Sequence, residues 1–360
     1  MGRHTFNFDW ITGLLLLCLG SFGLFLLLTL GYSIFYQQLL FLIIGFILLA
    51  VCSRIDPVIL WWFAPIGYVL GNIFLALSYL GPNIRGATRW IIIGGAQLQP
   101  SELAKPLFLL AFSYFIVKYN PRNLRNIPIH IVLFLVPFLL VFKQPDLGSS
   151  LVYGSFWIAM LLGGGLPVSV IGIGGIVAAL LVPATWTFLH PYQRDRIMTF
   201  LNPALDPKGA GYNALQAMIA VGSGQFIGRG LGRGTQSHLR FLPEHHTDFI
   251  FATLVEELGF LGGILLFALY AILLVRIILP FLHEEHHDLG TYAYSIGLFA
   301  MLFSQIMINT GMNMGLIPIT GITLPFVSYG GSSILSLAIA FGFLWAIQRS
   351  KYEDAGIAIR

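Results

Sequence analysis

The chain has 360 residues, of which 57% are hydrophobic and only 9% are charged, and its formal net charge is +4. Because a soluble domain usually has about a quarter of its residues charged, this composition excludes a soluble globular protein and indicates a polytopic membrane protein. The two cysteines, Cys18 and Cys52, both lie in apolar runs, which favours buried thiols over a disulfide or a metal pair.

Apolar segments near the length of a membrane-spanning helix follow one another along the chain. Their predicted bounds are 10–30, 32–52, 57–80, 101–117, 128–142, 149–162, 167–188, 249–280, 291–312 and 332–348. We therefore expect an all-α fold with about ten transmembrane helices, forming a single integral membrane domain over residues 1–360. The fifth and sixth segments are short and are expected to tilt or break.

Residues 190–248, between the seventh and eighth predicted helices, form a long loop that we expect outside the cytoplasm. Within it, apolar residues at helical spacing over 212–222 predict a short helix that lies in the membrane interface or re-enters the membrane. A glycine-rich stretch at 222–234 follows. No strand precedes it, so it is not a dinucleotide fingerprint. Its glycines allow the backbone to approach a ligand or another helix closely.

The distribution of basic residues predicts the orientation of the chain. With a cytoplasmic N-terminus, the inside loops hold Arg3, Arg54, Lys118, Arg122, Arg125, Arg276, Arg349, Lys351 and Arg360. These loops are short, as the positive-inside rule requires. The opposite orientation would leave Lys118, Arg122 and Arg125 in a short external loop. We therefore predict that both termini are cytoplasmic.

Three cations gather near the predicted start of the fourth helix. Arg85 and Arg89 precede it, and Lys105 lies one turn inside it. Guanidinium groups and a helix N-terminus match phosphate oxygens, so the group suits a diphosphate. Two simpler interpretations stay open. Arg89 and Trp90 are typical interfacial anchors, and Lys105 is placed to pair with Glu102 at i, i+3.

Arg194 and Arg196 are a second candidate group for substrate binding, in the long loop. Acidic residues lie among them, so a solvated loop face explains them equally well. Taken with the first group, they put positive charge on one predicted face of the membrane, which fits polyanionic lipid substrates.

Carboxylates cluster at the start of the eighth predicted helix. Asp248 lies at the boundary between the loop and an aromatic-rich run, where partial desolvation raises the pKa of a carboxyl towards that of a working base. Its simpler role is to cap the helix that begins at Phe249. Glu256 and Glu257 lie about 12 Å deeper, and because adjacent helical residues point about 100° apart, at most one faces a given cavity well.

Two further features have less evident chemistry. His245 and His246 lack spaced partner ligands, so no dedicated metal site is evident, although assistance by a divalent cation, Mg²⁺ or Mn²⁺, is compatible with the sequence. Residues 321–332 are rich in glycine, proline and serine, which indicates a non-helical turn buried in the protein just before the last helix.

The polar motifs are distinctive when taken together. They are Arg89-Trp90 with Pro-Ser-Glu-Leu-Ala-Lys at 100–105, Asp-Pro-Lys-Gly-Ala-Gly-Tyr at 206–212, His-Thr-Asp-Phe-Ile-Phe at 246–251 with Glu-Glu-Leu-Gly at 256–259, and Leu-Pro-Phe-Val-Ser-Tyr-Gly-Gly at 324–331. Jointly they resemble the SEDS family (shape, elongation, division and sporulation) over essentially all the predicted helices. Gly-Thr-Gln-Ser at 234–237 resembles its rod-shape branch, RodA, more than its division branch, FtsW.

The resemblance implies a peptidoglycan glycosyltransferase that polymerises lipid II into glycan strands at the outer face of the bacterial cytoplasmic membrane, for cell elongation and rod shape. It also implies a partner, a class B penicillin-binding protein that cross-links the product, and no nucleic acid. By the same comparison Asp248 is the essential acidic residue, and one of the two glutamates lines its cavity. The full predicted substrate-binding set is Arg85, Arg89, Lys105, Arg194, Arg196, Glu256, Glu257 and Ser328.

One carboxylate and several cations suffice for this chemistry. The acceptor hydroxyl needs a base, whereas the leaving lipid diphosphate needs cations more than a proton, so we expect a single displacement with inversion. Two alternatives stay open, a lipid II flippase and a non-catalytic scaffold of the wall-synthesis complex. A flippase should show cavity charge from both faces, whereas the unusual charge here lies on one. A scaffold would not need Asp248.

Overall fold

The computed structural model describes residues 9–82, 88–93, 96–185, 194, 198–200, 211–239, 241–283 and 288–357. Its α-helices are α1 (Trp10–Leu30), α2 (Tyr32–Cys52), α3 (Pro57–Leu77), α4 (Pro100–Leu103), α5 (Lys105–Lys118), α6 (Ile127–Lys143), α7 (Leu147–Gly163), α8 (Val168–Thr185), α10 (Tyr212–Ser223), α11 (Thr235–His238), α12 (Ile250–Ile278), α13 (Pro280–His283), α14 (Leu289–Asn313) and α15 (Gly331–Ile357). Two 3₁₀ turns, Ser78–Leu80 and Leu124–Asn126, are also present.

The helices confirm the prediction of an α-helical polytopic membrane protein. Within the described residues, 8 helical segments are long and apolar enough to cross a bilayer, and α7 and the first part of α8 are shorter apolar helices. Each predicted segment overlaps one of these, although the short helices leave the total number of spans a prediction. The sequence did not predict one small hairpin, in which β1 (Ile91–Ile93) pairs antiparallel with β2 (Ala96–Leu98).

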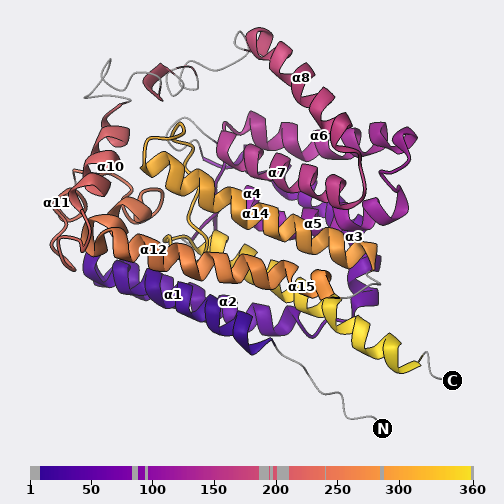
Figure 1. The fold of residues 1–360 in the computed structure, drawn as a ribbon, viewed down its shortest axis with the longest axis horizontal. Coiled ribbons are helices and arrows are strands. Elements are labelled where there is room, and N and C mark those ends of the chain that lie inside the picture. The colour runs from indigo at the N-terminus through magenta and orange to yellow at the C-terminus, as the bar shows by residue number, and fades with distance from the viewer. Residues whose placement is uncertain are drawn as a thin grey trace.

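The long helices lie side by side, with α10 and α11 at one end and both chain termini at the other (Figure 1). Helices α5 and α15 form the centre: α5 packs against α3, α7 and α14, and α15 packs against α2 and α5. Helices α2 and α6 instead expose most of their apolar surface, as expected where lipid replaces water. Side chains all around α1 to α3 are apolar because one face meets protein and the other meets the bilayer.

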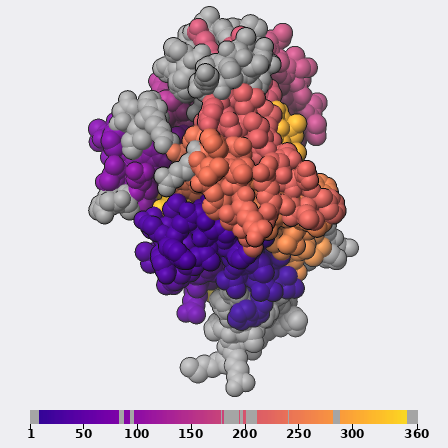
Figure 2. Space-filling model, turned by 90° about the vertical axis from the view of Figure 1, so that its left-hand side faces the viewer, coloured from indigo at the N-terminus to yellow at the C-terminus, as the bar shows by residue number. Residues whose placement is uncertain are grey.

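Helix α12 begins at the end of the molecule that holds α10 and α11 and runs towards the termini (Figure 1). Helix α14 runs back, so its last residue, Asn313, reaches the start of α12 and hydrogen-bonds to Asp248. Figure 2 faces this end of the bundle, where atoms coloured for the 211–260 region cover the centre beside the N-terminal helices. The start of α12 and helices α10 and α11 therefore lie at the end opposite the termini (Figure 1).

Helix α12 is interrupted at Gly259, whose φ of 70° and ψ of −166° are not helical. The glycine-rich segment supplies partners for the peptide groups freed by the break. Phe260 N–H donates to the Gln225 carbonyl at 2.9 Å, and Arg229 N–H donates to the Glu256 carbonyl, also at 2.9 Å. Such pairing is required because an unpaired peptide group is costly at membrane depth.

Glycine is needed where these two backbones touch. A Cβ added to Gly228 would lie 2.1 Å from the Glu257 carbonyl oxygen, and one added to Gly224 would lie 1.9 Å from that of Val255. Of the two uses that the sequence allowed for the glycine-rich stretch, close approach to another helix is therefore the one seen in the structure.

Candidate functional site

Asp248 lies in the turn that leads into α12 and is partly exposed. The N-cap position of α12 is occupied by Phe249, whose own side chain makes no capping hydrogen bond. Asp248 therefore lies one residue before the N-cap position that the sequence predicted for it. A Cβ added to Gly321 would lie 3.3 Å from Oδ2 of Asp248, so the carboxylate lies against the 321–330 segment.

The backbone around Asp248 is held from several sides. Ser328 Oγ donates to the Thr247 carbonyl at 2.7 Å and accepts from Leu324 N–H at 2.8 Å. Tyr329 N–H donates to the His246 carbonyl at 2.9 Å. Ser328, predicted to bind substrate, is thus buried and bound to the protein backbone. Its evident effect is to fix the turn that carries Asp248.

Lys105 is fully buried at the junction of α4 and α5, and its Nζ lies 2.5 Å from Oε1 of Glu102, which is 5% exposed. The i, i+3 pair anticipated from the sequence is therefore present. The lysine Nζ therefore contacts a carboxylate inside the protein and is not presented to solvent. The backbone carbonyl of Glu102 also accepts from Ser336 Oγ at 2.6 Å, which ties this pair to α15.

A further buried carboxylate, Asp146, lies near the pair of Lys105 and Glu102, and the sequence alone did not single it out. Asp146, 2% exposed, caps α7 by accepting from Ser149 N–H at 3.0 Å, and also accepts from Ser101 Oγ at 3.1 Å and Gln99 Nε2 at 3.0 Å. An aspartate three residues before a serine at the start of an apolar run is the signal that predicts such a cap. Asp146 joins the 99–101 segment to α7.

Glu256 and Glu257 are both fully buried and both point at the glycine-rich segment and α11, from adjacent positions on α12. Oε1 of Glu256 accepts from Gln236 N–H at 2.8 Å, and Oε2 accepts from Ser237 Oγ at 2.9 Å. Oε1 of Glu257 lies 2.7 Å from His238 Nε2. Both carboxylates thus hold the segment that covers this end of the bundle.

We expect the Glu256→Ala substitution to lower the stability of the protein. The partly buried N–H of Gln236 and the buried N–H of Ser237 would each lose their acceptor. At about 1–3 kcal/mol for each unsatisfied group, the free energy of unfolding should fall by up to about 2–6 kcal/mol. The melting temperature in detergent measures the effect. Thr235→Val, which removes only a hydroxyl 3.3 Å from Glu256 Oε1, is the control and should change little. An unchanged melting temperature for Glu256→Ala would contradict the anchoring role.

Of the four arginines predicted to bind substrate, two lie within the described residues. Arg89 lies just before β1 and is partly exposed, and its Nε has no hydrogen-bond partner in the part of the chain described. Arg194 is also partly exposed. Arg85 and Arg196 lie outside the described residues. The gathering of these arginines around a diphosphate therefore stays a prediction.

His246 does not add a cation next to Asp248 near neutral pH. Burial lowers its pKa, and the neighbouring His245 lowers the pKa further, while Glu244 opposes the shift. His245 Nδ1 lies 3.0 Å from the Leu242 carbonyl. Among the described residues no group of three or more His, Cys, Asp or Glu side chains is arranged to hold a metal ion. Assistance of the reaction by Mg²⁺ or Mn²⁺ stays a prediction.

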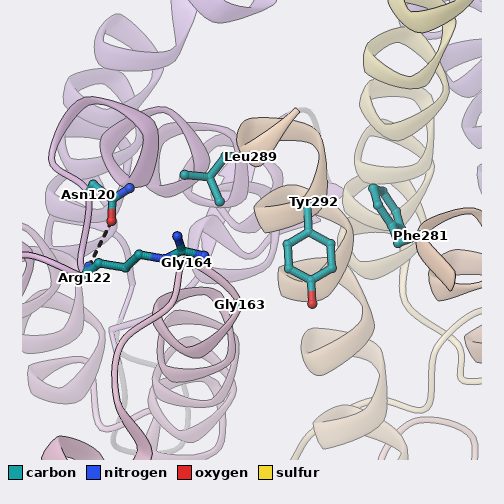
Figure 3. Close-up of a pocket in the computed structure, with 7 residues that line it drawn as sticks. All are labelled: Asn120, Arg122, Gly163, Gly164, Phe281, Leu289 and Tyr292. Carbon is teal, nitrogen blue, oxygen red and sulfur yellow. Dashed lines mark hydrogen bonds between the residues drawn. The ribbon is translucent and has the colours of Figure 1, made fainter. Parts of the chain in front are cut away.

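A cavity of about 480 Å³ lies elsewhere, and Figure 3 shows its lining. The lining residues are Asn120, Arg122, Gly163, Gly164, Phe281, Leu289 and Tyr292. Leu289 begins α14, whereas Asn313, at the other end of that helix, contacts Asp248. The cavity is therefore at the end of the bundle that holds the termini, and it contains none of the predicted site residues.

A bundle of apolar helices with a fixed, partly exposed carboxylate at one end defines an integral membrane protein with a polar site at one membrane face. The sequence matches the model of a family described as cell cycle proteins, that of FtsW, RodA and SpoVE, over residues 6–353. The chain belongs to this family, and the resemblance drawn from its motifs is confirmed.

Relatives and solved structures agree with this assignment. The peptidoglycan glycosyltransferase MrdB of Escherichia coli is 40% identical over 310 residues, 85% of this chain and 83% of the relative. Stage V sporulation protein E of Bacillus subtilis is 37% identical, over 88% of this chain and 87% of the relative.

Among solved structures, one that describes how a peptidoglycan synthase complex coordinates polymerization and crosslinking superposes with a TM-score of 0.83 at 31% identity, covering 97% of this chain and 99% of the other. The rod shape determining protein RodA of Thermus thermophilus superposes with a TM-score of 0.73 at 27% identity, with the same coverage.

Proposed function

We propose that Asp248 is the catalytic carboxylate of this chain, a peptidoglycan glycosyltransferase that polymerises lipid II into glycan strands during cell elongation. The observation that carries the proposal is the placement of Asp248. It is partly exposed, it is held by its backbone, and it lies at one end of the helix bundle. The transferase activity and its substrate come to this chain from MrdB, at 40% identity over most of both chains.

The arrangement suits a single displacement. The Asp248 carboxylate takes the proton of the acceptor sugar hydroxyl as that hydroxyl attacks the anomeric carbon of the donor, and the lipid diphosphate leaves with inversion. Arg89 and the remaining predicted arginines neutralise the departing phosphates, because guanidinium groups match phosphate oxygens. Bound Mg²⁺ or Mn²⁺ would supply further positive charge to the leaving diphosphate. In this scheme the buried Lys105, Glu256 and Glu257 support the site without touching the reacting atoms.

The basic residues and the position of the termini predict how the chain is oriented in the membrane. Both termini lie at the end opposite Asp248 (Figure 1), and the basic residues of short loops predict that this end is cytoplasmic. The chain is then a multi-pass protein of the bacterial cytoplasmic membrane with Asp248 at the outer face. A class B penicillin-binding protein is its partner, which fits the likeness to a complex that coordinates polymerization with crosslinking.

The test is reconstitution of polymerisation. The purified chain, with and without its penicillin-binding partner, is given labelled lipid II with Mg²⁺, with Mn²⁺, or with a chelator. Glycan ladders on a gel support the transferase, and their loss in chelator supports metal assistance. Movement of fluorescent lipid II across liposome membranes without ladders would instead identify a flippase. If neither ladders nor movement is seen with the partner present, the chain acts as a scaffold.

A further inference from the structure

We infer that Asn309 and Asn313 of α14 are positioning residues that keep Asp248 out of helix α12 and set its carboxylate against the 321–330 segment. The inference rests on the proposed role of Asp248. The sequence alone does not single out these asparagines. The signal available was a pair of asparagines at i, i+4 near the end of a predicted membrane helix, which places both on one face.

Asn313 replaces a backbone hydrogen bond at the start of α12. In a helix that began one residue earlier, Ala252 N–H would donate to the carbonyl of Asp248, four residues before it. Instead, Asn313 Oδ1 accepts from Ala252 N–H at 3.1 Å, and its Nδ2 donates to the Asp248 carbonyl at 3.0 Å. Helical bonding begins only with Thr253 N–H and the Phe249 carbonyl, at 3.1 Å. One side-chain amide thus satisfies both groups and leaves residue 248 in the turn.

Asn309 ties the same carbonyl to the segment that touches the carboxylate. Its Nδ2 donates to the Asp248 carbonyl at 2.9 Å and to the Ile322 carbonyl at 2.7 Å. Ile322 follows Gly321, the residue that lies against Oδ2 of Asp248 and has a φ of 76°. The amide nitrogen therefore fixes the distance between the start of α12 and the 321–330 segment, with Asp248 between them.

Both asparagines are fully buried, so they act through the backbone of Asp248 and not on the substrate. A catalytic group displaced by about 1 Å costs on the order of 100-fold in rate. Loss of either amide should therefore lower kcat, because the carboxylate no longer meets the acceptor hydroxyl correctly. Binding of lipid II, which depends on other groups, should change little, and KM should stay near its native value.

The same helix offers a matched control, Gln305. It lies one turn before Asn309 and is 1% exposed, yet neither Oε1 nor Nε2 has a hydrogen-bond partner in the described part of the chain. Gln305→Met removes a buried amide of similar volume that has no bond to Asp248. This variant therefore distinguishes loss of the hydrogen bonds to Asp248 from the general effect of altering the buried face of α14.

The experiment measures kcat and KM for lipid II polymerisation by the chain with its partner. The variants are Asn309→Ala, Asn313→Ala, Asn313→Asp, Gln305→Met and Asp248→Asn, each with its melting temperature. Asn313→Asp preserves the shape and the acceptor for Ala252 N–H but loses the donor to Asp248, so it serves if the alanine variants do not fold. We expect kcat to fall about 100-fold in the asparagine variants, with KM and the Gln305→Met enzyme within about twofold of native.

Either of two results would overturn the inference. One is native kcat in folded asparagine variants, including Asn313→Asp. The other is a loss of kcat in Gln305→Met as large as theirs, which would indicate core packing instead of positioning. Activity in Asp248→Asn is a separate outcome, since it refutes the proposed role of Asp248 itself.

Discussion

Replacing Asp248 by asparagine is expected to abolish glycan polymerisation while leaving the protein folded. The amide has the shape of the carboxylate but cannot accept the proton of the acceptor hydroxyl, and loss of a general base costs about 100- to 10,000-fold in rate. The fold should persist because asparagine keeps the shape of the side chain, and the backbone carbonyl of residue 248 stays bound to Asn309 and Asn313. Ladder formation from labelled lipid II measures the change.

The matched control is Asp288→Asn, at the opposite end of the bundle. Asp288 caps α14 by accepting from Thr291 N–H at 2.9 Å, and asparagine caps helices about as well as aspartate, so polymerisation should be unchanged. Ladders of native intensity from folded Asp248→Asn would remove this residue from the chemistry. The search for a base would then turn to other carboxylates, such as the buried Asp146 and Glu102.

Gly259→Ala is expected to prevent folding or to destabilise the protein severely. The backbone of Gly259, with φ 70° and ψ −166°, lies in a region that essentially only glycine adopts, and strain of this kind costs about 1–3 kcal/mol. The added Cβ would also lie 2.2 Å from the Gly228 nitrogen, a backbone atom that has no room to move. Separating the two segments would leave the N–H groups of Phe260 and Leu261 without acceptors at membrane depth.

Gly263→Ala, one turn further along the same helix, is the control. Its Cβ would meet nothing closer than a Val255 methyl at 3.6 Å, and alanine in a helix is favoured over glycine by about 0.5–1 kcal/mol. We expect Gly263→Ala to match or exceed the native melting temperature in detergent, and Gly259→Ala to give little monodisperse protein on size exclusion. Equal behaviour of the two variants would show that the break at Gly259 is not required for the fold.

The sequence by itself determined the class of the protein and the positions of its helices. Membrane spans are local features, because about 20 consecutive apolar residues are both necessary and visible in the sequence. The bounds 10–30 and 32–52 coincide with α1 and α2. Helix α10 lies where apolar spacing predicted a short helix. Asp248 was identified from the sequence because a charged side chain next to an apolar membrane segment is costly whatever the tertiary structure, which makes it a candidate functional residue.

Only the tertiary structure decided which partners the polar groups take. From the sequence, Glu256 and Glu257 were candidate substrate-binding residues, of which at most one was expected to face a cavity well. The structure shows both bound to the segment from Gly232 to His238. Asn309 and Asn313 hold Asp248 across 61 and 65 residues of chain. No local pattern reports such a contact, since a buried polar group needs a partner but its sequence does not specify which one. The packing of α14 against α12 makes that choice, and it thereby sets where the carboxylate of Asp248 stands.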